Sequence, residues 1–89
     1  MAYAIKLKPS AVKIFEKLPK PIQKRIAAKI DDLSENPRPP GVEKLSGEDD
    51  FYRIRTGDYL LIYTINDDVL LVLILKIGHR REIYRRMHG

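Results

Sequence analysis

Three prolines within residues 36–41 (NPRPPG) constrain the fold of this chain more than any other feature. Proline fixes its own φ angle and lacks a backbone N–H, so this segment is expected to be neither helix nor the centre of a sheet. The spacing of apolar residues also changes here, from mainly helical before the segment to alternating after it. We therefore expect a stiff loop that joins a largely helical part to a β-rich part.

A first strand is expected before the helical part. Residues 3–8 alternate apolar and polar side chains, which predicts a half-buried strand with Tyr3, Ile5 and Leu7 on its apolar face. Pro9 ends this strand.

Two amphipathic helices are expected next, and residues 19–21 (PKP) break the chain between them. The first helix covers residues 11–18 with Ser10 as its N-cap, and Pro21 suits the first turn of the second. The two helices would form a hairpin. Their apolar stripes are Val12, Phe15 and Leu18, with Ile14 beside them, and Ile22, Ile26, Ile30 and Leu33.

Three strands are expected after the proline-rich loop. Residues 51–55 alternate, residues 59–65 form the next strand, and residues 69–76 are so uniformly apolar that their strand is predicted to be central. Residues 42–50 are expected to be irregular. The order strand, helix, helix, strand, strand, strand predicts a single α+β domain over residues 1–89. In it a helical hairpin covers one face of a four-stranded, mostly antiparallel sheet, and a short basic tail follows.

The pair Gly57-Asp58 predicts a two-residue hairpin turn. Such a turn places Arg55 opposite Leu60 and Arg53 opposite Ile62. Opposed residues share a face of a sheet, so both arginines are expected on the face that the helices do not cover.

Two guanidinium groups so close together repel each other unless an anion lies between them. A phosphate suits this position, because arginine donates to phosphate oxygens in a bidentate manner. The alternative is that Arg53 and Arg55 are solvated and have carboxylate partners such as Asp49 or Asp58.

Charge and composition narrow the class of function. The net charge is +5, with basic segments at both ends and an acidic middle. This pattern is a weak argument for a polyanionic partner, because a solvated surface without such a partner can show the same charges. The chain has no cysteine, no metal-ligand spacing and no glycine-rich phosphate loop, so neither a metal nor another cofactor is expected. No signal peptide or membrane span is indicated, and a cytoplasmic protein is expected.

Four segments, in this order, resemble the RelE toxins of bacterial and archaeal toxin–antitoxin systems: KLSG at 44–47, FYRIR at 51–55, GDY at 57–59 and IGHRREIY at 77–84. The resemblance covers nearly the whole chain, and the wider superfamily includes the ParE toxins, which poison DNA gyrase. It implies a ribosome-dependent endoribonuclease that cuts the mRNA codon in the A site without a metal. In that reaction the 2′-hydroxyl attacks the adjacent phosphate and leaves a 2′,3′-cyclic phosphate.

The resemblance also implies roles for individual residues. Family members often have lysines where Arg53 and Arg55 stand, but arginine is effectively always protonated, so we expect these two to stabilise the charge of the phosphorane. Arg80 matches a residue that stabilises the transition state, and Tyr84 matches an aromatic residue that stacks on the base. Further RNA contacts are expected from Lys44, His79, Arg81 and Arg85.

Leu60 departs from the family pattern, which has arginine directly after the tyrosine of this strand. Loss of one preorganised donor commonly costs about 10²–10³ in rate. The departure therefore predicts an attenuated nuclease, unless Arg81 or Lys44 compensates.

Three functions stay open on the sequence: an mRNA endonuclease, a ParE-like gyrase inhibitor without nuclease activity, and a module that only binds its antitoxin. A RelB-like antitoxin is the expected partner in each toxin interpretation, since a basic surface suits an acidic peptide that folds on binding. The endonuclease would also bind the ribosome and mRNA. No membrane partner is expected, and operator DNA would be contacted only through the antitoxin.

Overall fold

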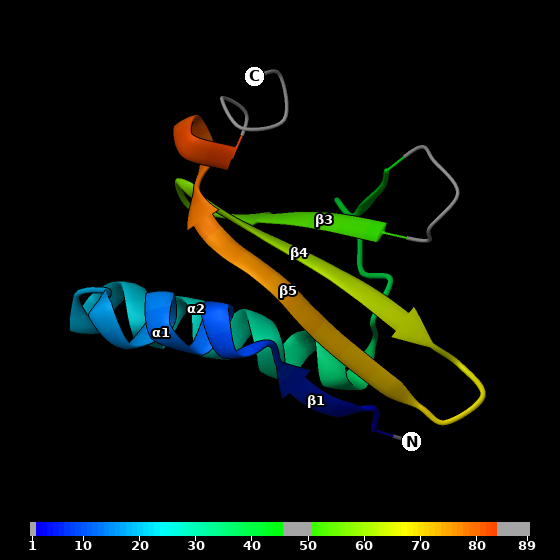
Figure 1. Ribbon diagram of the computed structural model, residues 1–89. Coiled ribbons are helices and arrows are strands. Elements are labelled where there is room, and N and C mark those ends of the chain that lie inside the picture. Colours follow the sequence, from blue (N-terminus) through cyan, green and yellow to red (C-terminus); the bar gives the residue numbers. More distant parts are fainter. Residues whose placement is uncertain (1, 46–50, 84–89) are drawn as a thin grey trace.

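The computed structural model describes residues 2–45 and 51–83. Within these residues, two helices and five strands follow one another (Figure 1). They are β1 (Ala4–Leu7), α1 (Pro9–Lys17), α2 (Lys20–Glu35), β2 (Glu43–Lys44), β3 (Phe51–Thr56), β4 (Tyr59–Asn66) and β5 (Leu71–His79). A helical turn, residues 80–83, comes directly after β5.

The strands form one sheet in the order β1-β5-β4-β3-β2. Only β1 runs parallel to its neighbour; the other pairs are antiparallel. The predicted α+β class is confirmed, and the apolar strand β5 lies inside the sheet between β1 and β4. The sheet has five strands and not four, because two residues of a segment expected to be irregular, Glu43 and Lys44, pair with β3. A strand of two residues carries no alternation that a sequence pattern could detect.

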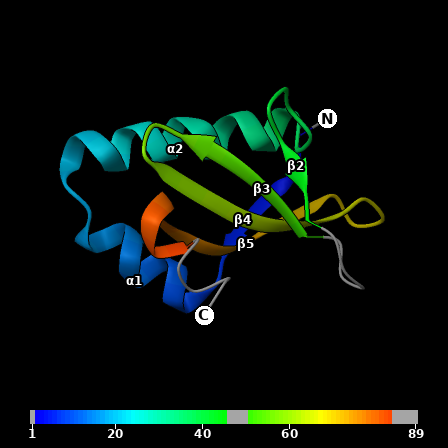
Figure 2. The same ribbon diagram turned by 90° about the horizontal axis from the view of Figure 1, so that it is seen from above.

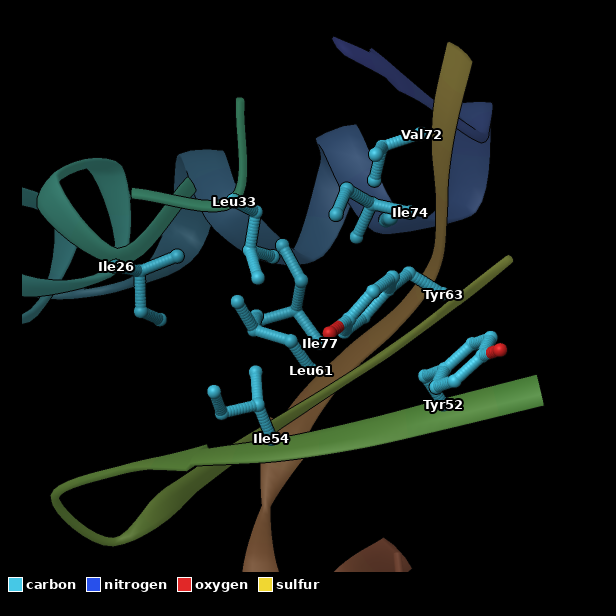
Figure 3. Close-up of a cluster of buried hydrophobic side chains, with 10 residues drawn as sticks. Ile26, Leu33, Tyr52, Ile54, Leu61, Tyr63, Val72, Ile74 and Ile77 are labelled. Carbon is cyan, nitrogen blue, oxygen red and sulfur yellow. The ribbon is translucent and has the colours of Figure 1, made fainter. Parts of the chain in front are cut away.

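Both helices pack on one face of the sheet, and the turn of residues 80–83 lies on the other side (Figures 1 and 2). The core between helices and sheet is formed by buried side chains from α1, α2, β3, β4 and β5 (Figure 3). The predicted stripe of α2 is confirmed: Ile26 and Leu33 are buried, and Ile22 and Ile30 pack beside them. No helix within residues 2–45 and 51–83 has both the length and the apolar character needed to cross a membrane.

The predicted stripe of α1 is partly wrong. Val12 and Ile14 are 38% and 39% exposed, and the buried stripe runs instead through Ala11, Phe15 and Leu18. The helix begins at Pro9, with Lys8 and not Ser10 as its N-cap. A small residue at the contact lets α1 approach β5 closely, which apolar periodicity based on large residues does not detect.

Strand β5 differs from its prediction at both ends and in its middle, and it continues to His79 instead of ending at residue 76. It begins at Leu71, because Val69 is 65% exposed and Leu70 has a φ of 53° in the preceding turn. In the middle, Ile62 pairs with Lys76 while Tyr63 pairs with Ile74. Leu75 is therefore an extra residue, a β-bulge.

The bulge reverses the alternation of β5. Ile74 and Ile77 both face the helices although they are three residues apart. Lys76 consequently faces the opposite side of the sheet, together with Ile62.

A polar clasp, formed by Tyr3, Arg38 and Asp67, joins three distant segments at the end of the sheet near β1. Arg38 donates from Nη1 and Nη2 to the two Asp67 oxygens at 3.2 and 2.9 Å, and the Tyr3 hydroxyl donates to Asp67 Oδ1 at 2.7 Å. Close by, the Tyr63 hydroxyl donates to the Pro37 carbonyl at 2.7 Å, and burial raises the pKa of Tyr63 to about 12. The clasp thus fastens the proline-rich loop to the start of the chain and to the β4–β5 turn.

The clasp predicts an acid-dependent part of the stability. The hydrogen bonds from Arg38 and then Tyr3 hold the pKa of Asp67 below its ordinary value. A lowered pKa contributes stability above the pKa of the unfolded state, about 3.9, and this contribution is lost as the pH falls through the folded value. We expect Asp67→Asn to lower the thermal midpoint at pH 7, and the difference from the parent to shrink below about pH 4.

Circular dichroism melts at several pH values measure this effect. Asp68→Asn is the matched control, because Asp68 is the next residue in the same turn and lies outside the clasp. An equal loss for Asp67→Asn at pH 3 and pH 7 contradicts the prediction.

Candidate functional site

The predicted hairpin register is confirmed: Arg53 pairs with Ile62 and Arg55 with Leu60. The alternate residues of β3, Tyr52 and Ile54, belong to the core beneath the helices. Both arginines therefore lie on the face of the sheet opposite the helices, as expected.

The two arginines have partners within the chain. Arg53 forms an ion pair with Glu43, its neighbour across the β2–β3 pair, and its side chain is only 18% exposed. Arg55 Nε donates to the carbonyl oxygen of Gly57 at 2.9 Å. The predicted repulsion is thus relieved by a glutamate that the sequence analysis did not consider and by a backbone carbonyl.

A basic corner, formed by Asp58, His79, Arg80 and Arg81, lies where the β3–β4 turn meets the end of β5. These residues line a cavity of about 520 Å³. The Arg80 N–H donates to the Asp58 carbonyl at 2.9 Å, which ties the helical turn to the β3–β4 turn. Because Arg55 contacts the same β3–β4 turn through Gly57, the strand arginine and the basic corner are neighbours.

The side chain of His79 is held on two sides. Its Nδ1 accepts the Arg81 N–H at 3.2 Å, and the Tyr59 ring stands edge-on to it with ring centroids 5.5 Å apart. With Nδ1 engaged as the acceptor, Nε2 is the ring nitrogen that is left to donate. The basic corner thus combines guanidinium and imidazole donors, which suit a phosphate.

The face opposite the helices is less open than expected. Leu60 is 2% exposed and forms a second apolar cluster with Ile62 and Ile83, against which Leu45 and Phe51 pack. Leu60 therefore does not lie exposed between the basic side chains, because the turn of residues 80–83 covers it.

An apolar groove of about 420 Å³ continues from this cluster toward α1. It is lined from α1 by Ser10 and Ile14, and from the sheet and the helical turn by Leu45, Phe51, Ile62, Leu75, Lys76, Ile77, Gly78, Glu82 and Ile83. The site therefore has a basic end and an apolar end.

The structure separates one predicted RNA contact from the others. Lys44 pairs with Tyr52, so the register places it on the helix-facing side of β3, away from Arg53. Tyr84 and Arg85, the predicted base-stacking and RNA-binding residues, lie outside the described residues.

Two basic residues near the site were missed. Lys76 lies in the same row as Arg53 and Ile62, because of the bulge at Leu75. Arg25 reaches from α2 to the β3–β4 turn, where a Cβ on Gly57 would stand 2.6 Å from its Nη1. No local sequence signal marks either residue, because the bulge and the helix–turn contact arise only on folding. Gly57 itself has a φ of +62°, so this turn favours glycine for two reasons.

The chemistry available to this arrangement is the binding of an anion. Arginine stays protonated near neutral pH and therefore cannot act as a general base. Rigidly held guanidinium groups nevertheless stabilise charge that develops on a phosphate. Within residues 2–45 and 51–83 no group of three or more His, Cys, Asp or Glu side chains is placed to hold a metal ion.

Comparisons with known proteins place this geometry in a family. A family model described as the ParE toxin of type II toxin–antitoxin systems matches residues 5–84. Toxin RelG of Mycobacterium tuberculosis is 34% identical over 97% of this chain and 100% of its own length. A protein of Escherichia coli named as a RelE-like toxin is 34% identical over 92% of this chain and 87% of its own length.

A solved structure supports the same relationship. The archaeal RelE–RelB complex from Pyrococcus horikoshii contains a chain of the same fold, with a TM-score of 0.80 and 38% sequence identity. The match covers 90% of this chain and 97% of that one. The chain thus belongs to the RelE/ParE family of toxins of type II toxin–antitoxin systems, and its named relatives make it a RelE-like member.

Proposed function

We propose that this chain is an endoribonuclease that cuts mRNA in the ribosomal A site, in the cytoplasm, without a metal. One observation carries the proposal: Arg55 and the basic corner meet at the β3–β4 turn, on the face opposite the helices. A set of fixed cations at one place matches the charge of a phosphodiester in its transition state.

The proposed reaction is an internal transfer of the phosphate. The 2′-hydroxyl oxygen bonds to phosphorus and loses its proton to water. The bond from phosphorus to the 5′-oxygen breaks, and the 5′-oxygen takes a proton from water. The products are a 2′,3′-cyclic phosphate and a 5′-hydroxyl end. Arg53, Arg55 and Arg80 stabilise the negative charge of the phosphorane in this proposal.

The remaining residues bind the RNA in this proposal. His79 and Arg81 line the basic corner and donate to neighbouring phosphates, while Tyr84 stacks on a base and Arg85 adds a further contact. Lys44 is left out of this set, because its pairing with Tyr52 places it on the other face of the sheet. Leu60 leaves one donor fewer than in the toxins that the chain resembles, so we propose a slower cleavage than theirs.

A RelB-like antitoxin is the proposed protein partner. The solved relatives from P. horikoshii, M. tuberculosis and E. coli are toxin–antitoxin complexes. The apolar groove next to the basic corner offers this chain a surface that a folding peptide can bury while its acidic residues face the arginines. Operator DNA would be reached only through that antitoxin.

A ParE-like inhibition of DNA gyrase is the alternative function. It uses the same fold but needs no nuclease site. The relatives named RelE and RelG do not favour it. Inhibition of gyrase-driven supercoiling by the purified chain, in the absence of any RNA cleavage, would support this alternative.

The nuclease proposal predicts a loss of cleavage when one donor is removed. Arg55→Ala and Arg80→Ala should each lower the rate of mRNA cleavage about 10²–10³-fold, because each removes a fixed charge from the phosphorane. Primer extension on a defined mRNA in a cell-free translation reaction measures the cut positions and their rates.

Lys6→Ala is the control, since it removes an exposed cation from β1, at the far edge of the sheet. Equal cleavage by the parent, Arg55→Ala and Arg80→Ala refutes the assignment of these residues.

The ion pair of Arg53 predicts that one substitution raises the rate of mRNA cleavage. A phosphate must compete with the Glu43 carboxylate for this guanidinium. Glu43→Gln should therefore raise the cleavage rate at subsaturating protein about two- to fivefold, the size expected of one exposed ion pair. Glu35→Gln removes the same charge from the end of α2 and is the matched control. A slower Glu43→Gln protein would mean that Glu43 positions Arg53 and does not compete with the substrate.

A further inference from the structure

Leu60 lies at the centre of the face opposite the helices. Its neighbours across the sheet are Arg55 on β3 and Gly78 on β5. Its side chain is 2% exposed, and it clusters with Ile62 and Ile83, each 6% exposed. A residue at the expected position of a catalytic donor is thus part of an apolar core.

Ile83 sits directly on the backbone of Gly78. A Cβ placed on Gly78 would stand 3.1 Å from Ile83 Cγ1 and 3.2 Å from Ile83 Cδ1. Glycine at this position leaves a notch beside Leu60, and the Ile83 side chain fills it. The space at Gly78 and the Leu60 side chain together form a packing site for Ile83, which is called the seat below.

The helical turn depends on such contacts for its position. The start of the turn is held by the Arg80 N–H on the Asp58 carbonyl and the Arg81 N–H on His79 Nδ1. Two residues further along, Ile83 packs on Leu60 and Gly78. Arg80 and Arg81 thus belong to a turn that is attached to the sheet at both places.

We propose that Leu60 is a positioning residue: it seats Ile83 and thereby holds Arg80 and Arg81 against the β3–β4 turn. The seat itself follows from packing, while its consequence for cleavage rests on the proposed nuclease function. The chain replaces one donor of the toxins it resembles by an apolar contact that orders two other donors.

The proposal reverses the effect expected from restoring the family arginine. In Leu60→Arg the new guanidinium would lie beneath Ile83, among apolar side chains and directly opposite Arg55. A buried charge without a partner is strongly unfavourable, and a like charge opposite adds to the cost. The guanidinium therefore moves out toward solvent and displaces the helical turn.

Amide hydrogen exchange followed by NMR tests the seat without any RNA. We expect Leu60→Arg to speed the exchange of the Arg80 N–H about a hundredfold. The reason is that the cost of burying one unpaired charge is large enough to release the turn from the sheet. The conservative Leu60→Met should keep the protection of the parent. Thr64→Arg places the same charge four residues further along the same face of β4 and should also keep this protection. Unchanged Arg80 protection in Leu60→Arg overturns the proposal.

A second variant decides the case if Leu60→Arg unfolds as a whole, which loss of protection at Val72 and Ile74 would reveal. Ile83→Ala removes the seated side chain from the turn and leaves the helix-facing core intact. It should speed exchange at Arg80 about tenfold or more while Val72 and Ile74 stay protected. Unchanged exchange at Arg80 in this variant overturns the proposal.

The translation reaction provides the activity readout. We expect Leu60→Arg to cleave mRNA about tenfold or more slowly than the parent, at saturating as well as limiting protein. Leu60→Met should cleave at the rate of the parent. Faster cleavage by Leu60→Arg overturns the proposal, because it would show that the arginine acts as a donor. If the parent does not cleave at all, the nuclease function is refuted, and the exchange rates at Arg80 still decide whether Leu60 seats the turn.

Discussion

Burial of β4 on both of its faces is the constraint on which the rest of the structure depends. Leu61 and Tyr63 face the helices, while Leu60 and Ile62 face the helical turn of residues 80–83. Neighbouring strands pair with β4 along both edges, so it has no solvated side over this stretch. The same four residues therefore form part of the main core and the floor of the candidate site. A substitution on one face of β4 shifts the backbone and thereby moves the side chains on the other face.

The sequence predicted the parts of this protein that local patterns control. The Gly57-Asp58 turn determined the β3–β4 register, and with it the shared face of Arg53 and Arg55. The α2 stripe followed from regular spacing of large apolar residues. The remaining features depend on contacts between distant segments: a two-residue strand, a bulge that turns Lys76 over, and the burial of Leu60 by Ile83. Tertiary packing decides each of these, and no window of the sequence contains both partners.

The cations of the candidate site are held in two physically different ways. Arg53 and Arg55 project from a paired strand, whose hydrogen bonds fix their Cα positions at no further cost. Arg80 and Arg81 project from a helical turn that the apolar contacts of Ile83 and two hydrogen bonds donated by its backbone attach to the sheet. Preorganised charge stabilises a bound anion best when its support is rigid. The strand arginines therefore contribute a constant electrostatic stabilisation, while the contribution of the turn arginines is lost when the turn moves away from the sheet. A partner that occupies the apolar groove would act on the turn arginines.

The parallel pairing of β1 with β5 has a consequence for the order in which the protein takes shape during its own synthesis. Residues 4–7 leave the ribosome well before residues 71–74, which are the one strand partner that the described part of the chain gives them. Contacts so distant in sequence form late, since a long loop must close before they are gained. The helices can form early, but the sheet, and with it the meeting of Arg55 with Arg80, waits until residues 71–83 have emerged. A toxin whose proposed target is the ribosome thus lacks its basic corner until this late segment of its own synthesis is complete.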